Sequence, residues 1–573
     1  MSEVTFVTKT ENSLKQEKIE KIKVGEISEY KVKLIFSDFI SPSEYVISWE
    51  TEQIDTIGFW SPRHHFDSNI TPDWEKRTSV SKMTQGAPVV SLYSKSNENR
   101  MTISLSDPKT PISIMAGVIE ETGKIGYEIR LFCEKVSKMS EYEITIRLDT
   151  RKIPFYKAVE ETKRWWSELG FKKAYEPEHA SAPLYSAWYS FHQKTIPADI
   201  IYECKIAKEY GMDTVIVDDG WQTDDNSRGY GYCGDWEVCE KKIPDMKAFV
   251  DEIHKLDMKF MLWFSVPFLG FYSKNYERFK EMCLRTRDHM NAKVLDPRFK
   301  EVREFLVDIY ERFVLDYGID GLKLDFIDSF ILDEESSEEY DKMDTVSVED
   351  AVEMLLAEIS QRVKKINPEF LIEFRQSYIG PVISQYGNMF RVADCPNDPL
   401  VNRIHSLSMR MTQQGCVHSD MMMWNKNERP EALMQQLLST MFAVPQISIR
   451  FDDISSEHKK ILKWYISFWR AHKDTILKGE MEYFDVDANF TKARAIGKDE
   501  VVSVLYQGVV ATPLKDKTNY IFNATGKDYI YLELNGEAKY QIFDICGGKI
   551  RDGKLNQGVV KLEIADGGMV KIN

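Results

Sequence analysis

The sequence predicts a multidomain α/β and β protein, with a central (β/α)8 TIM barrel between an N-terminal β-sandwich and a small C-terminal β domain. Three observations carry this prediction. The chain has 573 residues, which is more than one hydrophobic core usually supports. Its middle alternates short apolar runs with helical periods, as parallel β/α units do. Both ends show short alternating strands separated by turn residues.

The domain boundaries follow these changes in rhythm. Residues 1–150 contain strand patterns such as YEITIRLD between Ser, Asn, Pro and Gly turns, which predicts the β-sandwich. Residues 151–182 form the predicted helical linker. Its helix is the amphipathic stretch PFYKAVEETKRWWSELG, which ends at Gly170. Residues 183–475 form the predicted barrel, and residues 476–573 the predicted C-terminal antiparallel β domain.

Eight strand candidates in the middle region match the number that closes a β/α barrel. They are apolar along nearly their whole length, as parallel strands buried on both faces should be. The intervening helical segments carry mixed charge, which is typical of helices with one solvent face. The eight runs are LYSAWYSF, TVIVDDGW, KFMLWFSVP, GLKLDF, FLIEFR, MFRVAD, GCVHSD and PQISIRF.

Composition excludes several classes of partner. The formal net charge is −16 and no dense basic cluster occurs, so a nucleic-acid partner is not expected. No apolar run reaches the length of about 18 residues that spans a membrane, and the N-terminus lacks a signal-peptide core. The eight cysteines are scattered without a C-x-x-C pair, which argues against zinc and a disulfide framework. We expect a cytoplasmic protein that needs no cofactor or metal; homo-oligomerisation is left open.

The ends of the predicted strands are acidic, and barrel enzymes place their chemistry there. A single Asp after a strand is often the N-cap of the next helix, which is our interpretation of Asp328 and Asp398. That explanation does not account for a whole ring of acids, because buried carboxylates without partners cost several kcal/mol. The strand-end acids are Asp218, Asp219, Asp325, Glu373, Asp394 and Asp420.

Carboxylates combined with aromatic side chains suit a sugar ligand. Carboxylates accept hydrogen bonds from hydroxyl groups, and indole faces pack against the C–H face of a pyranose. Glycoside cleavage then needs one carboxylate as nucleophile or base and one carboxylic acid. A metal-dependent barrel hydrolase with an oxygen site at Asp218, Asp219 and Asp325 stays open as an alternative, although no His-rich metal motif occurs. A sugar-binding protein without catalysis also stays open.

Several motifs, taken in order, resemble glycoside hydrolase clan D. They are DDGW at 218–221, GDW at 234–236, MLWF at 261–264, LKLD at 322–325, and an acid 69 residues later. The resemblance is strongest to family 36, the α-galactosidases, with family 27 nearby, and it extends to the order of the domains. It implies a retaining exo-α-glycosidase that hydrolyses terminal α-galactosides of oligosaccharides. It also leaves room for α-N-acetylgalactosaminidase, α-glucoside-type or transglycosylase activity.

The resemblance assigns roles residue by residue. Asp325 matches the nucleophile, and Asp394 falls where the family has its acid/base. Arg375 stands where the family has a Cys-Ser-Gly-Gly stretch at the O2 side of the sugar. A guanidinium there could accept a different C2 substituent or a charged group, so this departure bears on the galactose specificity and not on the α-glycosidase activity. Together with the strand-end aromatic and histidine side chains, the expected substrate-binding residues are Asp218, Asp219, Trp263, Lys323, Arg375, Arg391, Trp188, Trp221 and His418.

The mechanism implied by the resemblance sets opposite requirements for the two catalytic carboxyls. Asp325 must be ionised, and Lys323 is expected to lower its pKa and fix its orientation. Asp394 must start protonated, so we expect burial and the charge of Asp325 to raise its pKa. A retaining enzyme places the two carboxyls about 5–5.5 Å apart.

Overall fold

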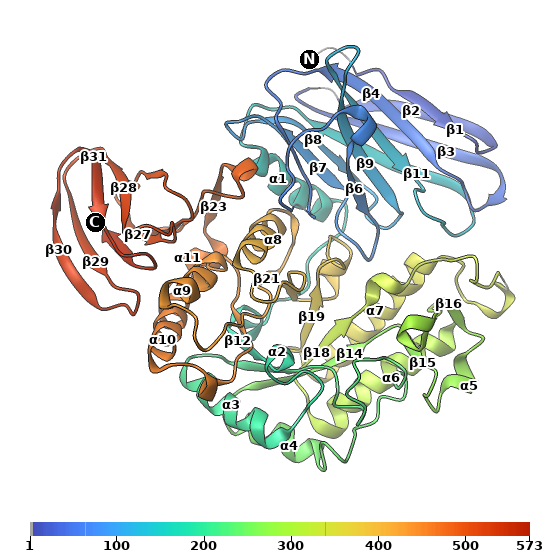
Figure 1. Cartoon of the computed structure of the whole chain (residues 1–573). Helices are drawn as coiled ribbons and strands as arrows, with labels where there is room; N and C mark the ends of the chain where they lie inside the picture. The colour runs from blue at the N-terminus through green and yellow to red at the C-terminus, as the bar shows by residue number, and fades with distance from the viewer. Residues whose placement is uncertain (1–3, 24, 64, 339) are drawn as a thin grey trace.

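The computed structural model describes residues 4–23, 25–63, 65–338 and 340–573, and its N-terminal part is a β-sandwich (Figure 1). Alternate side chains such as Val32, Ile47 and Ile129 are fully buried between the two sheets. The first sheet runs β1 (Val7–Thr10), β4 (Tyr45–Glu52), β10 (Lys124–Leu131), β9 (Ile112–Ile119) and β6 (Arg77–Ser81). The second runs β2 (Leu14–Lys23), β3 (Ile27–Ile40), β11 (Met139–Asp149), β8 (Asn99–Leu105), β7 (Val89–Tyr93) and β5 (Gly58–Trp60).

Helix α1 (Phe155–Glu168) connects the sandwich to the rest of the chain. It starts directly after Pro154, whose fixed φ suits a helix entry, and Gly170 follows its end with a φ of +110°. The indole of Trp166 is fully buried and donates a hydrogen bond to the carbonyl of Leu105 at 2.9 Å. The helix therefore packs against the sandwich rather than acting as a free linker.

All eight predicted runs form strands of one parallel sheet, which confirms the fold class. The sheet closes into a barrel through a parallel bridge between His418 and Val444, and helices surround it (Figure 1). In sheet order from the eighth barrel strand, the strands are β22 (Gln446–Ile447), β12 (Leu184–Ser186), β13 (Thr214–Val217), β14 (Lys259–Ser265), β18 (Gly321–Asp325), β19 (Leu371–Arg375), β20 (Met389–Arg391) and β21 (Cys416–His418).

The helices of the barrel region follow the strands as β/α units require. Asp398 caps one of them, α8, by accepting hydrogen bonds from the amides of Leu400 and Val401 at 3.1 and 3.0 Å, as we predicted. Asp328 is no such cap, because it lies inside the short 3-10 turn Ile327–Ser329, whose N-cap is Phe326. Its Oδ2 instead accepts a hydrogen bond from Ser377 Oγ at 2.9 Å. The helices are α2 (Trp188–Phe191), α3 (Pro197–Glu209), α4 (Met246–His254), α5 (Tyr276–Phe279), α6 (Lys300–Tyr317), α7 (Val348–Ile366), α8 (Pro399–Thr412), α9 (Pro430–Ser439), α10 (Ser456–Ala471) and α11 (Lys473–Lys478).

A small antiparallel sheet interrupts the barrel between β14 and α6. It contains β15 (Phe268–Gly270), β17 (Ala292–Leu295) and β16 (Cys283–Arg287). Every helix in the described part of the chain is too short or too polar to cross a lipid bilayer.

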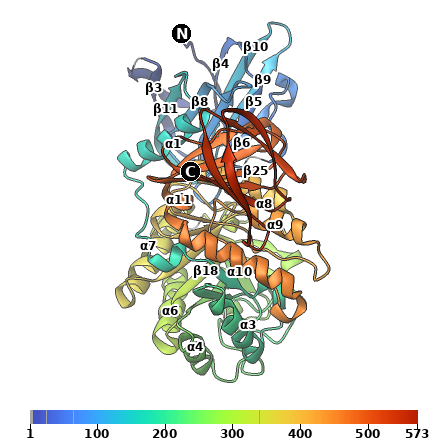
Figure 2. The same cartoon turned by 90° about the vertical axis from the view of Figure 1, so that its left-hand side faces the viewer.

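The C-terminal strands form two sheets, which face the viewer above α10 in Figure 2. Most of their strand pairs are antiparallel, as we expected, such as β23 with β24 and β28 with β31. Two pairs differ, because β25 pairs with β27 and β26 with β28 in parallel. The reason is that the chain leaves the first sheet at β26 and returns in the original direction. The sheets are β23 (Glu480–Phe484), β24 (Lys492–Ile496), β25 (Glu500–Leu505), β27 (Thr518–Asn523), β32 (Met569–Ile572), β29 (Ala538–Phe543) and β30 (Lys549–Leu555), and β26 (Val510–Ala511), β28 (Tyr529–Leu534) and β31 (Gly558–Glu563).

Candidate active site

Asp325 is the last residue of β18 and is held by four hydrogen-bond donors. Its Oδ1 accepts from Arg375 Nε at 3.0 Å, from the amide of Phe326 at 2.9 Å and from the hydroxyl of Tyr378. Its Oδ2 accepts from Trp263 Nε1 at 3.0 Å. The carboxylate is only 9% exposed, so these contacts fix its orientation at the carboxyl end of the barrel.

The surroundings of Asp325 favour its ionised form. Burial by itself raises the pKa of a carboxyl, but here the nearby charges of Arg375 and Lys323 and the hydrogen bonds from Tyr378 and Trp263 outweigh it. The net effect holds the pKa of Asp325 well below its usual range. Asp325 is therefore a carboxylate throughout the physiological pH range, as a nucleophile must be.

Lys323 lies two residues before Asp325 but makes its ion pair with Asp218. The distance from Lys323 Nζ to Asp218 Oδ2 is 2.5 Å, and both side chains are buried. Burial disfavours the lysine charge, but Asp218 outweighs it, so the pKa of Lys323 is raised. Lys323 lowers the pKa of Asp325 through its charge, as expected, whereas the orienting contacts come from Arg375, Tyr378 and Trp263.

Asp219 follows Asp218 after β13 and is buried against neutral partners. Its two oxygens accept hydrogen bonds from Gln193 Nε2 at 2.6 Å and Gln222 Nε2 at 2.7 Å. Because amides supply no compensating charge, burial raises the pKa of Asp219 to about 6. Asp219 and Asp325 thus meet opposite electrostatic environments.

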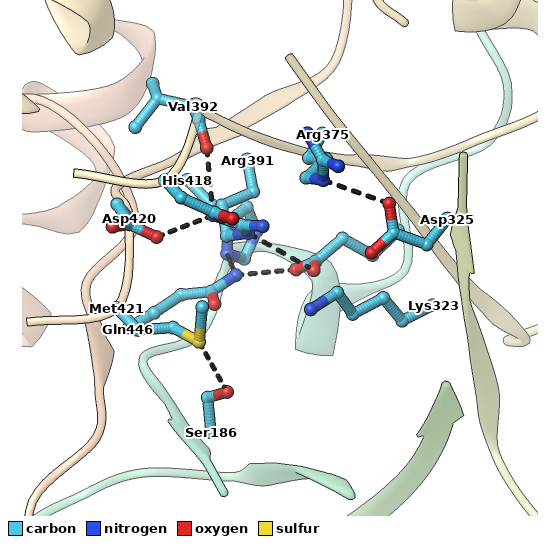
Figure 3. Close-up of polar contacts among 12 residues, drawn as sticks. Ser186, Lys323, Asp325, Arg375, Arg391, Val392, His418, Asp420, Met421 and Gln446 are labelled. Atoms are coloured by element: carbon cyan, nitrogen blue, oxygen red, sulfur yellow. Dashed lines mark hydrogen bonds and ion pairs between the residues drawn. The ribbon is translucent and has the colours of Figure 1, made fainter. Parts of the chain in front are cut away.

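Arg391, at the end of β20, lies at the centre of a buried polar cluster in the barrel interior (Figure 3). Its Nη1 lies 2.5 Å from Asp420 Oδ1 and 2.8 Å from Asp394 Oδ1. Its Nε lies 3.8 Å from Glu373 Oε1, and the other oxygen of Glu373 accepts a hydrogen bond from Gln446 at 2.5 Å. One guanidinium therefore connects the acids of three strand ends.

Asp394 does not have the raised pKa that we expected. Burial acts to raise it, but Arg391 and then Arg375 and Lys323 outweigh both burial and the charge of Asp325. The pKa of Asp394 is consequently lowered. Its side chain is 51% exposed, in contrast to the fully enclosed Arg391 beside it. The expectation was wrong because it weighed burial and the negative charge of Asp325 but not the three nearby cations.

Trp221 packs behind the site instead of facing it. Its indole is fully buried, stacks near Trp236 with ring centroids 5.9 Å apart, and donates to the carbonyl of Trp263 at 2.8 Å. No face is left open for a sugar, which corrects the expected substrate contact. The indole instead supports Trp263, which donates to Asp325.

His418 and Trp188, two further predicted substrate contacts, differ in their exposure to solvent. His418 is fully buried inside the barrel, with Nε2 2.8 Å from the carbonyl of Ala180 and Nδ1 3.3 Å from Gln446 Nε2. This enclosed position corrects its expected role as a substrate contact. Trp188 lies in α2 and is partly exposed, with the guanidinium of Arg228 over its ring at 5.3 Å; its binding role stays a prediction.

Tyr378, Gln193 and Gln222 contact the candidate site without having been predicted. They lie in loops after β19, β12 and β13, where neither apolar periodicity nor a motif marks them. Arg375 was predicted as a substrate contact, but in the structure it pairs with Asp325 and donates from Nη1 to the carbonyl of Gln376 at 3.0 Å. Within the described ranges, no three His, Cys, Asp or Glu side chains gather as a metal ion needs.

Comparison with solved structures places the fold among α-galactosidase structures. The α-galactosidase of Lactobacillus brevis has a TM-score of 0.66 at 12% identity, covering 100% of this chain and 84% of that one. The family 36 α-galactosidase AgaA of Geobacillus stearothermophilus, solved with stachyose, has a TM-score of 0.62 at 12% identity, covering 98% and 87%. At these identities the likeness concerns the fold alone.

The melibiase family matches residues 184–479, which is more than half of the chain and includes the barrel, so the chain belongs to this family. The α-galactosidase Mel36A of Lactobacillus acidophilus is 32% identical over 130 residues, 21% of this chain and 16% of the relative. The bifunctional α-galactosidase/sucrose kinase AgaSK of Mediterraneibacter gnavus is 31% identical over 158 residues, 26% and 16%. The matched part spans less than a fifth of these curated relatives.

Proposed function

We propose that the chain is a retaining exo-α-glycosidase that hydrolyses terminal α-galactosides of oligosaccharides. The observation that carries the proposal is Asp325, a buried and ionised carboxylate at the end of the fourth strand of a melibiase barrel. A second carboxyl, Asp394, follows the sixth strand and interacts electrostatically with it. Family 36 enzymes with this fold have been solved with stachyose and with raffinose, which supports an oligosaccharide substrate.

The hydrogen bonds of Asp325 indicate which oxygen attacks. Oδ1 accepts hydrogen bonds from three donors, whereas Oδ2 accepts only the hydrogen bond from Trp263 among the described contacts. Oδ2 therefore keeps a lone pair for the anomeric carbon. Its attack forms a β-glycosyl ester on Asp325 while Asp394 gives its proton to the departing glycosidic oxygen. Water then attacks the ester, Asp394 takes the water proton, and the Asp325 carboxylate is restored.

The lowered pKa of Asp394 must change during this cycle. A bound sugar displaces water from the half-exposed carboxyl, which raises the pKa of Asp394 and favours the acid form. Ester formation removes the negative charge of Asp325, which lowers the pKa of Asp394 again. The two steps thus favour the acid first and the base second.

The activity is tested with a panel of nitrophenyl α-glycosides, with NMR of the first-formed anomer. We expect fastest turnover of the α-galactoside, with the α anomer of the sugar released first, and no effect of EDTA. A β anomer released first would indicate inversion. Faster turnover of an α-N-acetylgalactosaminide or α-glucoside, or transfer to an added sugar, would select one of the other specificities. Loss of activity with EDTA would favour the metal-dependent alternative.

The nucleophile is tested with Asp325→Asn, which keeps the size of the side chain and removes its charge. We expect kcat to fall by more than about 1,000-fold, with circular dichroism unchanged. Asp325→Gly in the presence of azide should yield a β-glycosyl azide. Near-normal turnover by Asp325→Asn, or azide rescue that instead requires removal of Asp394, would reject the assignment.

A further inference from the structure

The segment of residues 376–380, directly after β19, carries Tyr378 to Asp325. We propose that the N-terminal β-sandwich positions this segment, so that a domain outside the barrel completes the catalytic site. This inference rests on the proposed function, because it concerns the same two aspartates. It identifies positioning residues and does not assign new groups that touch substrate.

Two loops of the sandwich contact the segment directly. The amide of Gly86, in the loop between β6 and β7, donates to the carbonyl of Ser377 at 2.9 Å. The side chain of Gln376 donates from Nε2 to the carbonyl of Pro62, just after β5, at 3.4 Å. Gln376 is buried, so this contact is enclosed between the sandwich and the barrel.

Gly380 shows how closely the two backbones approach. A Cβ atom at this position would lie 2.3 Å from the carbonyl oxygen of Gly86, which is far inside contact distance. Gly380 also has a φ of +123°, which favours glycine. The atom that the Cβ would meet belongs to the backbone of Gly86 and not to a flexible side chain. The clash can therefore be relieved only by moving the backbone of one of the two segments.

The barrel holds the opposite side of the same segment. Asp328 Oδ2 accepts a hydrogen bond from Ser377 Oγ at 2.9 Å. Gln413 Oε1 accepts one from the amide of Gly380 at 3.0 Å. The segment is therefore held between the sandwich and the barrel. Asp328 does not contact Asp325 itself; it holds Ser377, whose neighbour Tyr378 donates to Asp325.

The same contacts extend to the acid/base side. Gln376 Oε1 accepts a hydrogen bond from the amide of Ala393, the residue before Asp394, at 3.3 Å. The amide of Gln376 donates to the carbonyl of Arg391 at 2.8 Å. A displacement of the segment thus disturbs the placement of both Asp325 and Asp394.

The first test compares two glycine variants with similar backbone strain. Gly380→Ala adds the clash with Gly86, whereas Gly170 has a φ of +110° and nothing within 4 Å of its added Cβ. We expect Gly380→Ala to lower kcat at least tenfold with a smaller change in KM, and Gly170→Ala to keep both values. Equal kcat values for the two variants would overturn the proposal.

The second test uses Asp328 and a readout that mere destabilisation does not change. Asp328→Ala removes the acceptor for Ser377, whereas Asp328→Asn keeps one. We expect Asp328→Ala to shift the acidic limb of the kcat/KM profile to higher pH, because a displaced Tyr378 no longer donates to Asp325. Tyr378→Phe, which removes that donor directly, should shift the profile in the same direction. Asp328→Asn should stay close to the unmodified protein. A lower melting temperature for Asp328→Ala with an unshifted profile would count against the proposal, and this pair suffices if Gly380→Ala does not fold.

Hydrogen–deuterium exchange separates this proposal from the proposed function. In the sugar-free protein, backbone exchange in residues 376–386 should rise at least several-fold in Gly380→Ala and not in Gly170→Ala. If no glycoside on the panel is hydrolysed, the proposed function fails while exchange still tests the positioning. Unchanged exchange in an active Gly380→Ala variant would refute the positioning alone.

Discussion

Asp325 and Asp219 show how equal burial produces opposite protonation behaviour. Both carboxyls are almost inaccessible to water, and in both the loss of solvation disfavours the charge. Asp325 gains Arg375 and the field of Lys323, which more than compensate. Asp219 accepts hydrogen bonds from two glutamine amides, and these do not compensate for the lost solvation of its charge. The chemistry of each acid is therefore set by its partners and not by its depth.

This contrast predicts a pH dependence of stability at Asp219. Its pKa is raised from 3.8 to about 6 on folding, so the folded state binds the proton more tightly than the unfolded state between these values. Stability from this group is fully present below pH 4 and is lost as pH rises towards 6. The shift corresponds to roughly 3 kcal/mol. We expect Asp219→Asn to flatten the fall in melting temperature across this range.

The comparison should be made by thermal unfolding at several pH values between 4 and 7. Asp257→Asn is a suitable control, because the Asp257 carboxylate is 97% exposed and its one ion pair among the described residues, with Lys208 at 3.1 Å, lies at the surface. Parallel pH profiles for Asp219→Asn and the unmodified protein would show that Asp219 is ionised in the fold near its usual pKa. If Asp219 also contacts the sugar, the same variant should lose activity while it gains stability at pH 7.

At the scale of elements, the strands could be read from the sequence and the loops could not. The run GLKLDF is apolar because β18 is buried on both faces, and that pattern needs no knowledge of the neighbours. Gly321 adds a steric cause, since a Cβ there would lie 2.7 Å from the carbonyl of Leu371 on β19. Asp325 was therefore predictable as a strand-end residue, and the family resemblance supplied its role.

The contacts that set the protonation of the site were harder to predict. Tyr378 reaches Asp325 from a loop that contacts Pro62 and Gly86 of the sandwich, and these two residues lie more than 280 positions earlier in the chain. The pKa of Asp394 depends on Arg391, Arg375 and Lys323 together, which come from three different strands. Spacing along one strand carries no information on such contacts between strands. The same reason explains why Trp221 and His418 were predicted to face the sugar.

At the scale of the whole molecule, the barrel and the C-terminal sheet share one hydrophobic core. Phe522 on β27 is fully buried and packs against Phe468 and Trp464 of α10, with ring centroids 4.9 and 5.8 Å apart. Leu532 on β28 is equally buried, but it belongs to a separate outer cluster between the two C-terminal sheets. The inner strands of this domain thus act as part of the barrel's support.

This arrangement predicts different consequences for two large-to-small substitutions in the same domain. Phe522→Ala should cost about 3–5 kcal/mol and should destabilise the barrel together with the C-terminal sheet, since the cavity opens between them. Leu532→Ala should cost about 2–5 kcal/mol but should destabilise the outer sheet first.

Calorimetry, run alongside the temperature dependence of residual glycosidase activity, measures both effects. We expect Phe522→Ala to lower the inactivation temperature with the unfolding midpoint, whereas Leu532→Ala should show an earlier transition that leaves activity intact. Equal loss of activity in the two variants would mean that the whole C-terminal domain unfolds with the barrel as one unit.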